Sequence, residues 1–137
     1  MNCHVGIDYG RTRLGIATGD AHGLLVQGWP TVVASGFKDA VRQVASFIAE
    51  QEVTEIVIGL PLNMDGSRGE MAEEVERFAS ALGAATELET VLWDERLTSK
   101  QAKCLLAERG NSRKIGDVDR VAAALMLESY LCSLSTT

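Results

Sequence analysis

The sequence has few of the residues that hold disulfide-bonded or zinc-bound folds together. Among its 137 residues it has three cysteines and two histidines. Cys3, Cys104 and Cys132 lie far apart and form no Cys-x-x-Cys pair. This supply of ligands is too small for a structural zinc site. The odd, scattered cysteines indicate reduced thiols in a cytoplasmic protein rather than a disulfide framework.

Long apolar runs are also missing. No stretch approaches the ~18 consecutive apolar residues of a membrane span. The first residues lack the basic and apolar regions of a signal peptide. The sequence shows no internal repeat, low-complexity tract or linker rich in Pro, Gly or Ser. We therefore expect residues 1–137 to form a single cytoplasmic domain that makes no contact with membranes.

Positive charge is in deficit, with 13 Lys and Arg against 19 Asp and Glu, for a net charge of −6. This balance argues against a generally basic nucleic-acid-binding domain. The deficit is uneven, however. Residues 93–120 carry seven Lys and Arg against five Asp and Glu, whereas acidic residues gather at 50–55 and 70–76. The acidic total limits non-specific affinity for nucleic acid but leaves room for a local phosphate-binding track.

The apolar pattern predicts an α/β fold. Short apolar runs, several of them rich in β-branched residues, predict strands at 3–8, 14–18, 24–33, 56–60 and 88–93. Helical spacing predicts helices at 37–51 and 118–133. Two further helices are predicted from capping boxes, Ser67 with Glu70 and Thr98 with Gln101, and end at Gly83 and Gly110. Three meandering strands followed by strand–helix repeats predict a central mixed five-stranded sheet flanked by helices.

Three carboxylates stand where ligand sites form. Asp8 ends an apolar strand, where a buried unpaired charge costs several kcal/mol. Glu95 follows the strand at 88–93, and Asp119 lies in the first turn of the last helix. Each alone has an ordinary structural explanation: a turn cap, a loop ion pair and a helix N-terminus, respectively. Brought together, they suit Mg²⁺ or Mn²⁺, ions that promote phosphodiester hydrolysis.

The segments that contain these residues closely resemble the YqgF family. They are Val5–Gly10, GLPLNMDG at 59–66, DERLTS at 94–99 and the last helix from Val118 to Tyr130. That family has an RNase H-like fold and is related to the RuvC-type Holliday-junction resolvases. The resemblance implies a metal-dependent nuclease that matures the 5′ end of pre-16S ribosomal RNA. It also implies that Asp8, Glu95 and Asp119 are the catalytic, metal-binding positions.

The sequence departs from the wider superfamily at one strand. Many RNase H-like nucleases carry a carboxylate on the fourth strand, where this chain has Gly59-Leu60-Pro61. Glu95, which follows the next strand, would have to substitute for it. The surroundings of Asp119 are also less basic than in many relatives.

Five polar or basic residues near these segments are candidates for substrate contact: Arg11, Arg13, Asn63, Arg96 and Lys114. The expected partner is structured RNA, in association with pre-ribosomal RNA or the ribosome, and the expected state is a monomer or homodimer. Three alternatives stay open. One is a Holliday-junction resolvase acting on branched DNA as a dimer, and another is a non-catalytic RNA- or ribosome-binding module. The third is an ATPase of the actin type, which the short chain opposes.

Overall fold

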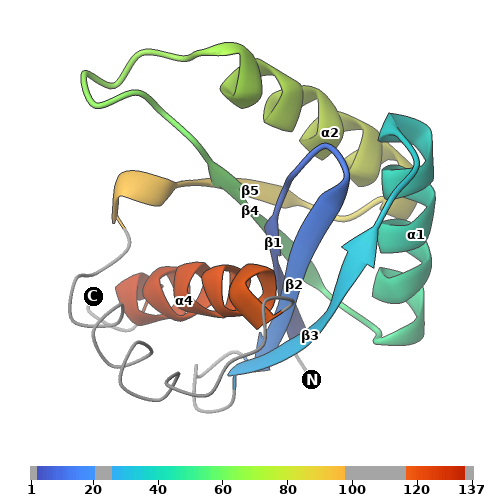
Figure 1. Cartoon of the computed structure of the whole chain (residues 1–137). Helices are drawn as coiled ribbons and strands as arrows, with labels where there is room; N and C mark the ends of the chain where they lie inside the picture. The colour runs from blue at the N-terminus through green and yellow to red at the C-terminus, as the bar shows by residue number, and fades with distance from the viewer. Residues whose placement is uncertain (1–2, 21–25, 98–116, 135–137) are drawn as a thin grey trace.

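The structure, a computed structural model, describes residues 3–20, 26–97 and 117–134 of the chain. The described part is built on a five-stranded sheet with the strand order β3-β2-β1-β4-β5 (Figure 1). The strands are β1 (Cys3–Asp8), β2 (Arg13–Asp20), β3 (Val26–Val33), β4 (Glu55–Leu60) and β5 (Thr90–Asp94). The first three are antiparallel neighbours, and β4 runs parallel to both β1 and β5. The predicted mixed five-stranded sheet is confirmed.

In the described part of the chain, three α-helices cover the sheet on its two faces (Figure 1). The helices α1 (Phe37–Glu50) and α2 (Glu70–Thr86) pack on one face, and α4 (Asp117–Leu134) packs on the other. The predictions of helices at 37–51 and 118–133 are therefore confirmed. The helix predicted to end at Gly110, with its Thr98–Gln101 capping box, lies outside the described residues.

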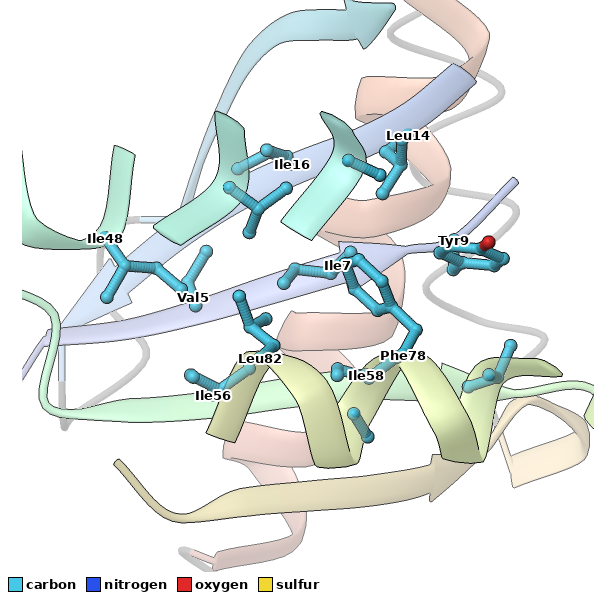
Figure 2. Close-up of a cluster of buried hydrophobic side chains, with 14 of the residues drawn as sticks. Val5, Ile7, Tyr9, Leu14, Ile16, Ile48, Ile56, Ile58, Phe78 and Leu82 are labelled. Atoms are coloured by element: carbon cyan, nitrogen blue, oxygen red, sulfur yellow. The ribbon is translucent and has the colours of Figure 1, made fainter. Parts of the chain in front are cut away.

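Successive side chains of each strand point to opposite faces of the sheet, so the strands contribute to two separate hydrophobic cores. Val5 and Ile7 of β1 are fully buried on the α1–α2 side, where Figure 2 shows Ile7 beside Phe78 of α2. Gly6, between them, faces α4, since a Cβ built on it would lie 2.8 Å from the Cβ of Leu127. Because successive side chains of a strand point to opposite faces, the even-numbered residues of β1 face α4. Asp8, the last of them, therefore lies on the α4 side of the sheet.

The start of α2 differs from the sequence prediction. Its N-cap residue is Gly69, and no side chain caps this helix. Ser67 turns back instead, donating from its backbone N–H (2.9 Å) and its hydroxyl (2.6 Å) to Asp65 Oδ1. The predicted Ser67–Glu70 capping box is wrong because Asp65 offers Ser67 a closer partner in a local turn.

The end of α2 also differs, since the helix continues past Gly83 to Thr86. Glu87 ends it by adopting the left-handed conformation, with φ of 59°. The Glu87 N–H then donates to the Gly83 carbonyl at 2.8 Å. Gly83 thus lies inside the last turn rather than beyond it.

Among the described residues, no helix has the length and apolarity needed to cross a membrane.

Candidate active site

Two of the predicted site residues stand at the same edge of the sheet. Asp8 is the last residue of β1, and Glu95 directly follows Asp94, the last residue of β5. The strand β4 lies between these two strands and is parallel to both. The carboxyl ends of parallel strands form the edge at which α/β sheets hold their ligands. A single strand separates the two carboxylate positions.

The side chain of Glu95 folds back over that intervening strand at Gly59. A Cβ built on Gly59 would lie 2.6 Å from Glu95 Oε1 and 3.1 Å from its Cγ. Real Cβ atoms essentially never approach another atom to 2.6 Å, so the carboxylate occupies space that any side chain at position 59 would fill. Glu95, from outside the fourth strand, therefore lies over the strand where many RNase H-like nucleases carry their own carboxylate.

Asp8 and the Glu95 carboxylate lie on the same face of the sheet. Val57, two residues before Gly59, packs in the core beneath α4, so Gly59 faces α4 as Asp8 does. The register of β1 and β4 pairs Ile7 with Ile58, which brings Asp8 level with Gly59 on the neighbouring strand. Neighbouring strands lie about 4.8 Å apart. The Glu95 carboxylate over Gly59 is thus adjacent to the strand end that bears Asp8.

The third predicted ligand, Asp119, belongs to the first turn of α4. The carboxyl-terminal half of α4 lies at the amino ends of β1 and β4, where the Tyr130 hydroxyl donates to Glu55 Oε1 at 2.9 Å. The carbonyl of Ala123 lies further along β1, at Gly6. The helix therefore begins on the side of the carboxyl ends. The side chain of Asp119 lies outside the described residues, within which no three potential metal ligands are grouped.

Arg96 joins this edge to the loop that follows β4. Its backbone N–H, Nε and Nη2 donate to the Asp94 carboxylate at 2.8–3.1 Å, and its Nη1 donates to the Met64 carbonyl at 3.3 Å. The hydrogen bonds from Arg96 lower the pKa of Asp94 below its usual value. The charge of the predicted substrate residue Arg96 is thus already paired, and its side chain connects the strand end to the loop.

Asn63, predicted to contact substrate, braces the same loop. Its backbone N–H donates to the Ser67 carbonyl at 2.9 Å, and its Nδ2 donates to the Ser67 hydroxyl at 2.9 Å. The Gly66 N–H closes the turn on the Asn63 carbonyl at 2.8 Å. The structure gives Asn63 a role in shaping the loop.

The other predicted substrate residues are spread more widely. The Arg11 side chain is 61% exposed, and its Nε donates to Glu74 Oε1 at 3.0 Å on the α2 side of the sheet. Arg13 is the exposed first residue of β2. Lys114 lies outside the described residues.

Sequence reasoning noted Gly59 only as the start of the segment where a carboxylate is absent, and it missed that the Glu95 side chain packs over this glycine. A signal was present, because a lone glycine interrupts an apolar, β-branched strand, and such a glycine often marks the close approach of another group. What approaches it depends on the strand order and on the side-chain direction of Glu95, which the local pattern does not contain.

Comparisons by sequence support the resemblance seen in the motifs. Residues 2–133 match the model of a family described as "RuvX: Holliday junction resolvase". A "Putative pre-16S rRNA nuclease" of Syntrophus aciditrophicus is 41% identical over 133 residues, which cover 96% of this chain and 89% of the relative. A protein of Trichormus variabilis with the same description is 43% identical over 129 residues, covering 93% and 85%.

Solved structures show the same fold at low sequence identity. A Thermus thermophilus RuvC in complex with Holliday junction substrate has a TM-score of 0.65 at 17% identity, covering 100% of this chain and 98% of its own. The fowlpox virus Holliday junction resolvase has a TM-score of 0.59 at 11% identity, covering 96% and 99%. The expected RNase H-like architecture is confirmed.

Proposed function

Because the chain belongs to the RuvX (YqgF) family, we propose that it is a divalent-metal-dependent nuclease that cuts RNA and matures the 5′ end of pre-16S ribosomal RNA. The observation that carries the proposal is the placement of the Glu95 carboxylate over Gly59, beside Asp8. The relatives described as pre-16S rRNA nucleases support the choice of RNA. The proposed setting is the cytoplasm, with pre-ribosomal RNA as the partner.

The donor set fits a hard divalent cation. Asp8 and Glu95 offer carboxylate oxygens, which Mg²⁺ and Mn²⁺ prefer as ligands. In the proposed site these two residues and Asp119 hold the ion. When bound, such a cation neutralises charge on the phosphate and lowers the pKa of water.

The protein's own contribution is to hold the ligands in place. Asp8 is fixed by the β1 ladder, which pairs it with Gly15 of β2. Glu95 begins the short 3-10 helix η1 (Glu95–Leu97), directly after β5. Ligands carried on regular elements keep their geometry better than ligands on loops. Such preorganisation is what phosphoryl chemistry requires of the protein.

We assign the direct substrate contacts to the three predicted basic residues Arg11, Arg13 and Lys114. Each of them adds a positive charge to which a phosphate can bind, and the Nε of Arg11 is at the same time hydrogen-bonded to Glu74. Arg96 and Asn63 act through the loop that they brace, since their polar groups are engaged with Asp94 and Ser67.

A second candidate substrate is branched DNA, because the matching family carries the description "Holliday junction resolvase". The same metal ligands would serve either phosphodiester. Paired cuts in a junction need two copies of the chain, so a dimer in solution favours this reading and a monomer favours RNA.

Cleavage assays test the proposal. The purified chain with Mg²⁺ or Mn²⁺ is offered a pre-16S ribosomal RNA fragment with its 5′ extension and, separately, a four-way DNA junction. We expect cleavage of the RNA and its loss in Asp8→Asn. The matched control is Asp20→Asn, at the opposite edge of the sheet, where Asp20 pairs with Cys3. Equal cleavage by Asp8→Asn and Asp20→Asn would refute the catalytic role of Asp8.

Absence of any metal-dependent cleavage by the wild type, together with retained RNA binding, would instead indicate a non-catalytic RNA-binding module. Cleavage of the junction alone would indicate a resolvase.

A further inference from the structure

A pocket of about 390 Å³ opens at the carboxyl end of β1, and neither Asp8 nor Glu95 lines it. It is lined by Tyr9, Arg11, Gly36, Phe37, Glu74 and Arg77. Tyr9 directly follows Asp8 and belongs to the core beneath α1 and α2, so the pocket lies on the face opposite to Asp8. Figure 2 shows Tyr9 at one end of this core, beyond Ile7.

The pocket carries an excess of positive charge. The Glu74 carboxylate accepts hydrogen bonds from the Tyr9 hydroxyl at 2.7 Å and from Arg11 Nε at 3.0 Å. Arg11 therefore offsets the charge of Glu74. Arg77 is exposed and close enough to act electrostatically on Tyr9 and Glu74, yet within the described part of the chain it makes no hydrogen bond or ion pair. One guanidinium is thus available for an anion.

The pocket also offers an aromatic surface that the core holds in place. Phe37, the first residue of α1, is 37% exposed. Its ring meets that of Phe78 edge-on, with centroids 6.2 Å apart, and Phe78 in turn packs against Tyr9 at 4.6 Å. A fixed, partly exposed ring beside an unpaired guanidinium is the combination that binds a base and a phosphate of a single strand.

We propose that this pocket is a nucleotide subsite for single-stranded RNA, in which Phe37 stacks on a base and Arg77 contacts a phosphate. The proposal rests on the proposed function in one respect, that the bound strand is the one cut at Asp8. Asp8 and Tyr9 are consecutive residues that face opposite sides of one sheet edge, so a strand crossing that edge passes from the active site to the pocket. An unpaired strand is required because a base inside a duplex has no free face for Phe37.

Binding in the absence of cleavage tests the subsite. The full chain with Asp8→Asn is titrated with a fluorescein-labelled oligouridine, and anisotropy gives the affinity at several salt concentrations. Arg77→Ala is expected to lower the slope of log affinity against log salt by about 0.7, the value for one phosphate contact on a single strand. Phe37→Leu, which keeps an apolar side chain at the start of α1, is expected to weaken binding about fivefold or more at unchanged slope.

The matched control is Arg42→Ala. It also removes one positive charge, but from α1 and outside the pocket, where Arg42 pairs with Asp39. Equal affinities and salt slopes for Arg77→Ala and Arg42→Ala would overturn the proposal. That result would leave the nuclease assignment intact. Conversely, cleavage by Asp8→Asn with a reduced slope in Arg77→Ala would refute the assigned catalytic site and keep the subsite.

Discussion

The carboxylate of Glu95 lies in the space that a side chain on Gly59 would occupy, 2.6 Å from the Cβ position of that glycine. Glu95 follows β5, whereas Gly59 belongs to β4, so the acidic side chain at the end of one strand covers the neighbouring strand. The absence of a side chain at position 59 is therefore a condition for placing Glu95 beside Asp8.

This relationship predicts that Gly59→Ala separates activity from stability. The group displaced is the end of a flexible side chain, so the free energy of unfolding should change by no more than about 1 kcal/mol. Moving the carboxylate by about 1 Å should lower cleavage about 100-fold. Urea unfolding and initial cleavage rates give the two quantities.

The control for this variant is Gly83→Ala in α2, where the new Cβ lies at an ordinary 3.5 Å from its nearest neighbour, the Leu88 carbonyl. It should keep the wild-type cleavage rate. If Gly59→Ala cleaves as fast as Gly83→Ala, position 59 does not set the position of Glu95.

Gly6→Ala should have the opposite effect, a loss of stability. A Cβ at Gly6 would lie 2.8 Å from the Leu127 Cβ and 3.2 Å from the Ala123 carbonyl. Both atoms belong to the body of α4, which must shift as a whole, so we expect a loss of about 1–3 kcal/mol. Urea unfolding followed by circular dichroism measures it, with Gly69→Ala, whose nearest neighbour is 3.8 Å away, as the control. Equal midpoints for the two variants would contradict the close packing of α4 on β1.

The two tyrosines should titrate far above their usual pH. Burial, aided by hydrogen bonds to Glu74 and Glu55, raises the pKa of Tyr9 and of Tyr130 to about 12. The usual value is about 10. Because the folded pKa exceeds the unfolded one, the unfolded chain loses these protons first, and stability falls as pH rises from about 10 to about 12.

Ultraviolet absorbance of tyrosinate follows this titration. The chain has only these two tyrosines, so the tyrosinate absorbance of the native protein should not rise near pH 10. In Tyr9→Phe, the rise in absorbance near pH 12 should be half that of the wild type. A rise in the tyrosinate absorbance of the native protein near pH 10 would show that at least one tyrosine hydroxyl does not have the environment described.

Removing Arg96 should loosen the loop between β4 and α2. Its guanidinium joins Asp94 to the Met64 carbonyl. In Arg96→Ala, exchange of the Gly66 amide, which donates to Asn63, should accelerate about twofold to fivefold, the effect of an exposed ion pair. Hydrogen exchange followed by NMR reports it, and Arg42→Ala should leave the Gly66 rate unchanged. An unchanged rate in Arg96→Ala would show that the loop holds its shape alone.

The strands were predictable because their residues carry the pattern locally. The run at 56–60 is apolar and β-branched, and β4 is a buried strand between β1 and β5, as expected of such a run. The ends of α2 were less predictable. Ser67 has two acidic candidates within three residues, Asp65 and Glu70, and the choice between them depends on the turn closed by Asn63.

The candidate site was predictable as a set of residue types and only partly as a geometry. Asp8 stood out because it ends an apolar strand. The packing of the Glu95 carboxylate over Gly59 depends on β4 lying between β1 and β5, and this strand order is a long-range property of the sheet. The pocket at Phe37 likewise joins residues from β1, α1 and α2 whose proximity no local spacing reveals.

Titration calorimetry with Mn²⁺ tests the central claim most directly, that Asp8 and Glu95 form one metal-binding site. Wild type, Asp8→Asn, Glu95→Gln and the control Asp20→Asn are each titrated without nucleic acid. We predict that wild type and Asp20→Asn bind Mn²⁺ with measurable heat and that Asp8→Asn and Glu95→Gln each lose this binding. Mn²⁺ binding by Glu95→Gln equal to that of the wild type would contradict the account.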